Sequence, residues 1–168
     1  MPKVTVKTAI ISPGEKYRYW LVRLWNHDPV AVFIMLNPST ADAETDDPTI
    51  RRCVDFANRW GCGGIIVANL FAYRATDPAE LMNVDDPFGP DNELHQINAL
   101  NIAKKYDAPI ICGWGSMTGL VSKVPKEFFN RVSADYRLQC LGVNADGSPK
   151  HPLYIPAETE PMDWNGYA

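Results

Sequence analysis

Four apolar segments have the length and composition of strands buried in a β-sheet. They cover residues 30–36 (VAVFIML), 64–70 (GIIVANL), 108–112 (APIIC) and 137–143 (RLQCLGV). Because they are apolar on both faces, they are typical of parallel strands that are covered from both sides. A further segment rich in aromatic residues, 17–25 (YRYWLVRLW), predicts a strand that forms a hairpin with residues 30–36 or leads into them.

Apolar positions at helical spacing predict three helices between these strands. They cover residues 48–60, 92–106 and about 120–132, the last interrupted by Pro125. Asp46 or Asp47 is expected to cap the first helix and Asp91 the second. The alternation of strands and helices predicts a single α/β domain over residues 1–168. Its expected architecture is a three-layer sandwich with a mainly parallel central sheet of about four strands plus an N-terminal hairpin strand.

The 168-residue chain has a formal net charge of −4 and no apolar run long enough to span a membrane. This charge argues against a protein that coats nucleic acid regardless of sequence, but it allows a small basic groove. No signal peptide is visible, so a soluble cytoplasmic protein without a membrane partner is expected. The cysteines form no CxxC pair and are expected to be small buried thiols: Cys53, Cys62, Cys112 and Cys140. The sequence leaves the oligomeric state open.

Polar residues stand at or shortly after the carboxyl ends of all four apolar segments. Asn37-Pro38-Ser39-Thr40 follows the first, Asn69 lies near the end of the second, Gly113-Trp114-Gly115-Ser116 follows the third, and His151 comes shortly after the fourth. Ligands of open parallel α/β sheets bind beyond these ends. We therefore expect the four groups to converge on one crevice.

Three of these side chains allow both a structural and a functional interpretation. The amide of Asn37 can orient a water molecule or a polar edge of a substrate, or it can form an Asx-turn before Pro38. Asn69 lies within an apolar run, so its amide needs partners, either in a neighbouring loop or on a ligand. His151 stands on a rigid Pro-rich loop, where it can act as an electrophile or an acid or serve the structure alone.

The neighbouring residues are open to the same two interpretations. Ser39, Thr40 and the backbone amides beside them can hold an anion. The glycines of the segment 113–116 allow the backbone to approach a ligand, whereas Trp114 can simply belong to the core. Arg74 can pair with Asp77 or with a substrate.

An acidic loop precedes the first predicted helix. It carries Asp42, Glu44, Asp46 and Asp47. A divalent metal is one possible ligand of these carboxylates, although their spacing matches no known ligand loop. Helix capping and solvation are the other interpretation.

The strings LNPSTADAETDDPTIRRC, NLFAYRATDP, GWGS and HPLYIP closely resemble domain of unknown function family 1643, a family of bacterial and phage proteins. This resemblance covers nearly the whole chain. The family name implies no activity.

More distantly, the order and placement of the motifs resemble the uracil-DNA glycosylase superfamily. IMLNPS is similar to the Asn-Pro loop of mismatch-specific uracil/thymine glycosylases, and IIVANLFAYRA, PIICGWGSM and HPLYIP resemble the later motifs. The resemblance implies a glycosylase-like fold and an active site. In that site Asn37 positions the attacking water, Asn69 reads the base and His151 stabilises the departing anionic base.

The same resemblance implies further contacts with a substrate. It places Leu153 or Tyr154 in the DNA groove and makes Phe71 and Tyr73 candidates for the ring that stacks on the flipped base. The remaining substrate-binding candidates are Pro38, Ser39, Thr40, Arg74, Trp114, Gly115 and Ser116. No cofactor and no metal are implied.

These observations favour a nucleobase glycosylase-like hydrolase that cleaves an N-glycosidic bond in DNA or in a nucleotide. The candidates for phosphate binding are Arg51, Arg52, Arg74 and Lys150. A non-catalytic module that binds a nucleobase or nucleotide is the alternative, and it suits Asn37 because an amide cannot take a proton. A metal-dependent phosphohydrolase built on the acidic loop is the third hypothesis.

Overall fold

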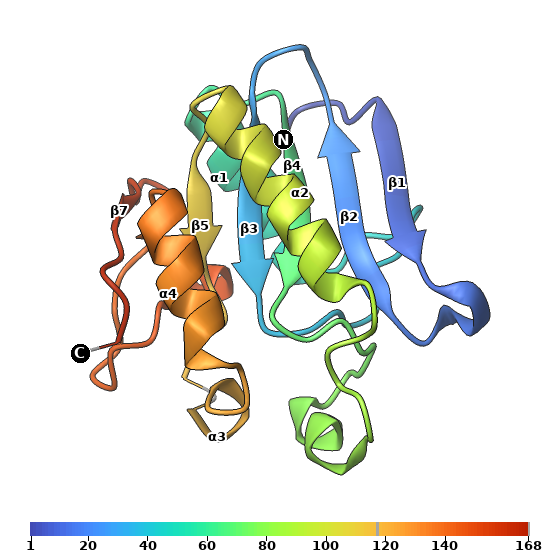
Figure 1. The fold of residues 1–168 in the computed structure, drawn as a ribbon. Helices are drawn as coiled ribbons and strands as arrows, with labels where there is room; N and C mark the ends of the chain where they lie inside the picture. The colour runs from blue at the N-terminus through green and yellow to red at the C-terminus, as the bar shows by residue number, and fades with distance from the viewer. Residues whose placement is uncertain (117, 168) are drawn as a thin grey trace.

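The computed structural model describes residues 1–116 and 118–167 of the chain. Within this part, seven strands form one sheet in the order β1-β2-β4-β3-β5-β6-β7 (Figure 1). The strands are β1 (Val6–Ile11), β2 (Arg18–Leu24), β3 (Val30–Met35), β4 (Gly64–Asn69), β5 (Ile110–Cys112), β6 (Gln139–Cys140) and β7 (Met162–Asp163). With the helices described below, the fold is α/β, as predicted.

The sheet is mixed, which corrects the prediction of a mainly parallel sheet. β4, β3, β5 and β6 run parallel and correspond to the four apolar segments, whereas β1, β2 and β7 join by antiparallel pairing. The predicted hairpin of residues 17–25 with residues 30–36 is wrong, because β2 pairs with β1 in the N-terminal hairpin and β4 lies between β2 and β3. β1 and β7 were not predicted because their side chains are mainly exposed, so no buried face marks their sequences.

Helices cover both faces of the sheet (Figure 1). They are α1 (Pro48–Arg59), α2 (Asn92–Lys105), α3 (Thr118–Val121) and α4 (Lys126–Asp135). α1 packs against Ala31 and Phe33 of β3, whereas α2 and α4 share a cluster with Val32 and Ile34 of the same strand. Successive side chains of a strand point to opposite faces, so β3 is buried from both sides. In the described part of the chain, no helix has the length and apolar character needed to cross a membrane.

The predicted helix boundaries hold for α1 and change for the third helix. Asp47 caps α1 by accepting a hydrogen bond from the backbone N–H of Ile50 at 2.9 Å. Asp91 occupies the cap position of α2, but its side chain makes no capping hydrogen bond to the described residues. The third predicted helix is split into α3 and α4, because Pro125 has no N–H to donate and stands at the start of α4.

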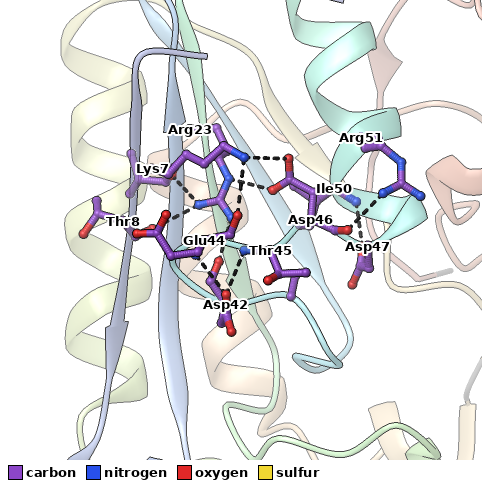
Figure 2. A network of polar contacts seen from close by, with 12 residues as sticks. Lys7, Thr8, Arg23, Asp42, Glu44, Thr45, Asp46, Asp47, Ile50 and Arg51 are labelled. Atoms are coloured by element: carbon purple, nitrogen blue, oxygen red, sulfur yellow. Dashed lines mark hydrogen bonds and ion pairs between the residues drawn. The ribbon is translucent and has the colours of Figure 1, made fainter. Parts of the chain in front are cut away.

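A buried arginine fixes the acidic loop that leads into α1. Figure 2 shows Arg23 at the centre of this network. Its Nε donates to Asp46 Oδ1 at 2.7 Å, and its Nη2 donates to the backbone oxygen of Asp42 at 2.6 Å. Lys7 of β1 adds a longer ion pair to Asp46 at 3.7 Å. The network ties the loop to β1 and β2, and so sets the position of Asp47 at the start of α1.

The four cysteines are buried free thiols, as predicted. Cys53 and Cys62 belong to the apolar cluster under α1, and Cys112 and Cys140 to the cluster under α2. Burial raises the pKa of each thiol, so the reactive thiolate is disfavoured.

Candidate functional site

A cavity of about 340 Å³ lies beyond the carboxyl ends of β3, β4 and β5. The strand register explains its place: Met35 of β3 pairs with Asn69 of β4, and Ile34 pairs with Cys112 of β5, so the segments that follow leave the sheet at one edge. The lining residues are Arg18, Met35, Leu36, Asn37, Ser39, Asp47, Thr49, Ile50, Val67, Asn69, Ala75, Thr76, Pro78, Trp114, Gly115, Ser116 and His151. The structure thus brings Asn37, Asn69 and His151 to one cavity.

Asn37 is held in one orientation by two backbone carbonyl groups. Its Nδ2 donates to the oxygen of Ala75 at 2.8 Å and to that of Pro38 at 3.0 Å. Both N–H groups of the amide are therefore used, and the assignment of its oxygen and nitrogen follows from the contacts. Within the described part of the chain Oδ1 has no hydrogen-bond donor, so it is the atom that can accept from a water molecule or a ligand.

Asn69, the last residue of β4, carries an unsatisfied amide. The residue is 1% exposed, and neither Nδ2 nor Oδ1 has a hydrogen-bond partner among the described residues. Its backbone oxygen, in contrast, accepts from Asn92 Nδ2 at 3.1 Å and from Gln96 Nε2 at 2.7 Å, both on α2. Helix α2 therefore fixes the end of the strand while the side chain is left for another partner. An unsatisfied buried polar group costs about 1–3 kcal/mol.

His151 is held so that Nε2 is the ring nitrogen that can donate a hydrogen bond. Its Nδ1 accepts from the backbone N–H of Leu153 at 3.2 Å, at the start of the short 3₁₀-helix η3 (Pro152–Tyr154). Burial lowers the pKa of His151 below its ordinary value of 6.5, and the carboxylate of Asp47 partly counters this shift. The imidazole is therefore neutral at pH 7, with its proton on Nε2.

Two charged residues of the cavity were missed as site residues in the sequence. Arg18 begins β2, and because β2 runs antiparallel to β4, its first residue lies at the edge where β4 ends. Asp47, one of the two residues expected to cap α1, does cap it, but it also lines the cavity. The available signal for Arg18 was a charged residue next to aromatic and aliphatic residues at the start of a predicted strand, where charge is rarely buried.

The glycines after β5 bring the third strand end against the loop of His151. A Cβ atom on Gly113 would lie 3.0 Å from Pro152 Cδ and 3.2 Å from Met35 Sδ, so a larger residue would push this loop away. Gly115 has a φ of +77°, which favours glycine, and its N–H donates to the oxygen of Pro149 at 3.0 Å.

Trp114 lies between these glycines and joins the cavity to the core. It is 2% exposed, and its Nε1 donates to Tyr167 Oη at 2.7 Å. Ser116, beside it in the lining, shares a hydrogen bond of 3.2 Å with the hydroxyl of Ser148. Trp114 thus fits both of its sequence interpretations, since it packs in the core and lines the cavity.

Seven predicted substrate-binding residues lie outside the cavity lining: Pro38, Thr40, Phe71, Tyr73, Arg74, Leu153 and Tyr154. Phe71 is fully buried and stacks on Phe88, with ring centroids 4.9 Å apart. Tyr73 packs edge-on against Tyr17, so neither predicted stacking ring lines the cavity. Tyr154 is 86% exposed at the surface.

The arginines proposed for phosphate binding donate to backbone carbonyl groups outside the cavity lining. Arg51 donates to Asp46 O at 2.9 Å, and Arg52 donates to Ile155 O. Arg74 donates to Glu15 O at 3.4 Å instead of pairing with Asp77, whose carboxylate caps the 3₁₀-helix η2 (Pro78–Asn83). Lys150, the fourth candidate, is exposed.

The carboxylates of the acidic loop make separate structural contacts. Asp42 Oδ1 accepts from the backbone N–H of Glu44 at 2.9 Å, Asp46 pairs with the buried Arg23, and Asp47 caps α1. In the part of the chain that the structure describes, no three His, Cys, Asp or Glu side chains gather as metal ligands. The capping interpretation of the loop is therefore the one that its contacts support.

Comparison with known proteins places this chain in a family. The family model described as Protein of unknown function (DUF1643) matches residues 18–153, a span that includes the whole cavity lining from Arg18 to His151. The chain belongs to this family. No curated protein and no solved structure matches the chain significantly. The DUF1643 match therefore covers the cavity without assigning it an activity, and the likeness to uracil-DNA glycosylases stays a prediction.

Proposed function

We propose that this DUF1643 protein is a cytoplasmic, nucleobase glycosylase-like hydrolase that cleaves an N-glycosidic bond in DNA or in a nucleotide. The proposal includes a three-layer sandwich of the uracil-DNA glycosylase kind. The observation that carries it is the buried amide of Asn69, whose donor and acceptor are both without a partner among the described residues, in the same cavity as Asn37 and His151. The edge of a pyrimidine base offers a donor and an acceptor side by side, so one amide can satisfy both.

The proposed chemistry assigns one role each to Asn37, His151 and Asp47 of the cavity. Asn37 Oδ1 accepts a hydrogen bond from a water molecule, whose oxygen attacks the anomeric carbon as the bond from that carbon to the base nitrogen breaks. The electron pair of the broken bond leaves with the base, and the Nε2–H of His151 donates to the oxygen on which negative charge develops. Asp47 takes the proton from the water, a role that an amide cannot fill. The departing base regains a proton from solvent.

Base release is the direct test of this function. The protein is incubated in EDTA with single- and double-stranded DNA, and with nucleotides, that carry uracil, mismatched thymine or hydroxymethylated cytosine. We expect mass spectrometry to detect free base and an abasic product, because the proposed steps use protein groups alone.

A binding module without turnover is the second candidate, and Asn37 favours it because the water-positioning group is an amide instead of a carboxylate. This candidate predicts that a nucleobase ligand raises the melting temperature while no base is released from any substrate. If the wild-type protein releases no base in the first experiment but is stabilised by the ligand, the binding module replaces the hydrolase as the proposed function.

The pH profile of base release tests the neutral state of His151. Protonation of Nδ1 would remove the acceptor for the Leu153 N–H, so the imidazole would lose the contact that orients it. We expect kcat/KM to be constant above pH 6.5 and to fall as the pH drops through the lowered pKa of His151. The free energy of unfolding should fall in the same direction, because the unfolded chain binds a proton at His151 more readily than the folded protein does. A kcat/KM that rises below pH 6 would contradict the neutral donor.

A further inference from the structure

Two arginines of β2 are equally buried but differ in their partners. Arg23, 0% exposed, forms an ion pair with Asp46 at 2.7 Å and donates to three backbone oxygens. Arg18, 2% exposed, donates from Nη1 to the oxygen of Ala41 at 2.6 Å, and its Nε is buried without a partner in the described part of the chain. No carboxylate of the described residues lies within 4.0 Å of the Arg18 guanidinium. Arg18 is thus a buried cation that forms no ion pair with a described residue.

The guanidinium of Arg18 remains charged at neutral pH despite its burial. Burial lowers its pKa to about 10, and Asp47 partly offsets this. Burying a charge is costly unless it is paired, and a guanidinium presents its N–H groups in a fork that matches phosphate or carboxylate oxygens. Since Arg18 lines the cavity, a ligand anion there can supply the missing partner.

We propose that Arg18 forms an anion subsite in this cavity and that the ligand is a free nucleoside monophosphate, with its base on Asn69 and its phosphate on Arg18. The assignment of the base rests on the proposed function, whereas the anion subsite stands on the burial and contacts of Arg18. Asp47 is the carboxylate in the described lining, and it accepts a hydrogen bond from the Ile50 N–H at the positive end of α1, which partly offsets its negative field at this subsite.

Three observations favour a free nucleotide over a nucleic-acid strand. The cavity, about 340 Å³, is near the lower end of the range for small-molecule sites, about 300–1,000 Å³. The chain has a net charge of −4, which repels a polyanion. The arginines that a strand would need already donate to carbonyl groups, as the exposed Arg51 and the half-buried Arg52 do. A single buried arginine fits one terminal phosphate.

Calorimetric titration of the full chain with four probes tests the subsite. The probes are uridine, uridine monophosphate, and a short uridine-containing oligonucleotide with and without a 5′-phosphate. We expect the wild-type protein to bind the monophosphate about 30-fold more tightly than the nucleoside, a typical effect of hydrogen bonds to a charged group. In Arg18→Met this ratio should fall to about one while the nucleoside affinity is kept, and Arg18→Lys should keep part of the ratio because it keeps the charge. Arg59→Met, at an exposed arginine of α1, is the matched control and should bind as the wild type does.

The outcomes separate this inference from the proposed function. Equal wild-type affinity for uridine and its monophosphate, or an unchanged ratio in Arg18→Met, overturns the subsite even if base release is observed. An Arg18-dependent preference for the monophosphate supports the subsite even if no substrate loses its base. A phosphorylated oligonucleotide that binds as tightly as the monophosphate overturns the assignment to a free nucleotide. If Arg18→Met does not fold, the ratio of the affinities for the monophosphate and the nucleoside is measured in Arg18→Lys, where it should be lower than in the wild type. A wild-type ratio of about one contradicts the subsite whichever variant folds.

Discussion

Replacing His151 with asparagine should lower kcat for base release by about 10²–10³-fold, the usual cost of removing one donor to a developing negative charge. Asparagine can keep the structural contact of His151, because its Oδ1 occupies the position of Nδ1 and accepts from the Leu153 N–H. It has no atom at the position of Nε2, so the donor to the leaving base is lost. Single-turnover measurement of base release, with KM determined in parallel, should show the loss in kcat.

His27→Asn is the matched control for this variant. His27 is exposed in the connection between β2 and β3, at the sheet edge opposite to the cavity, so its replacement should leave both constants unchanged. The proposed role of His151 would be refuted by a His151→Asn variant that is folded and releases base at the wild-type rate. A loss of thermal stability without a change in kcat would instead identify His151 as a residue that only caps η3.

Arg23→Met should lower the free energy of unfolding by about 3–5 kcal/mol, because it leaves the partly buried Asp46 with only its longer ion pair to Lys7 and frees the acidic loop from β2. Equilibrium unfolding in urea measures this loss. The double variant Arg23→Met/Asp46→Leu should recover part of the stability, since it removes the carboxylate that has lost Arg23.

Arg59→Met supplies the comparison on the surface. Arg59 is half exposed and pairs with Asp55 one helical turn away at 3.3 Å, so the loss should be less than about 1 kcal/mol. Equal losses in Arg23→Met and Arg59→Met would show that the network around Arg23 does not anchor the loop.

Short stretches of sequence were sufficient to predict the elements that depend on residues close together in the chain. Helix α1 follows from Pro48, the cap Asp47 and the spacing of its apolar residues, all of which lie within a few positions. The parallel strands follow from continuous apolar runs, and the positions of Asn37 and Asn69 follow from the rule that ligand-binding groups come after such strands. These predictions needed no knowledge of the partners across the sheet.

Other elements depend on contacts between distant segments. β1 and β7 are edge strands with exposed side chains, so no apolar run marks them and both were missed, whereas the antiparallel strand β2 was predicted as residues 17–25. Because β2 runs antiparallel to β4, its first residue, Arg18, lies at the cavity. Arg18 is overlooked when only the residues that follow strands are considered. The glycosylase resemblance made Phe71 a candidate for the ring that stacks on the base, but Phe71 packs on Phe88 of a distant loop.

The sequence by itself determined the α/β class, the buried parallel strands, the buried cysteines and the polar residues at the strand ends, because each depends on neighbours within one segment. The tertiary structure alone decided which polar groups are satisfied. Arg18 and Arg23 lie in the same strand and look alike in the sequence, but a loop 23 residues away brings Asp46 to Arg23, whereas no described carboxylate pairs with Arg18. The partner of a buried charge is determined by a long-range contact, and that contact cannot be predicted from the residues next to the charge in the sequence.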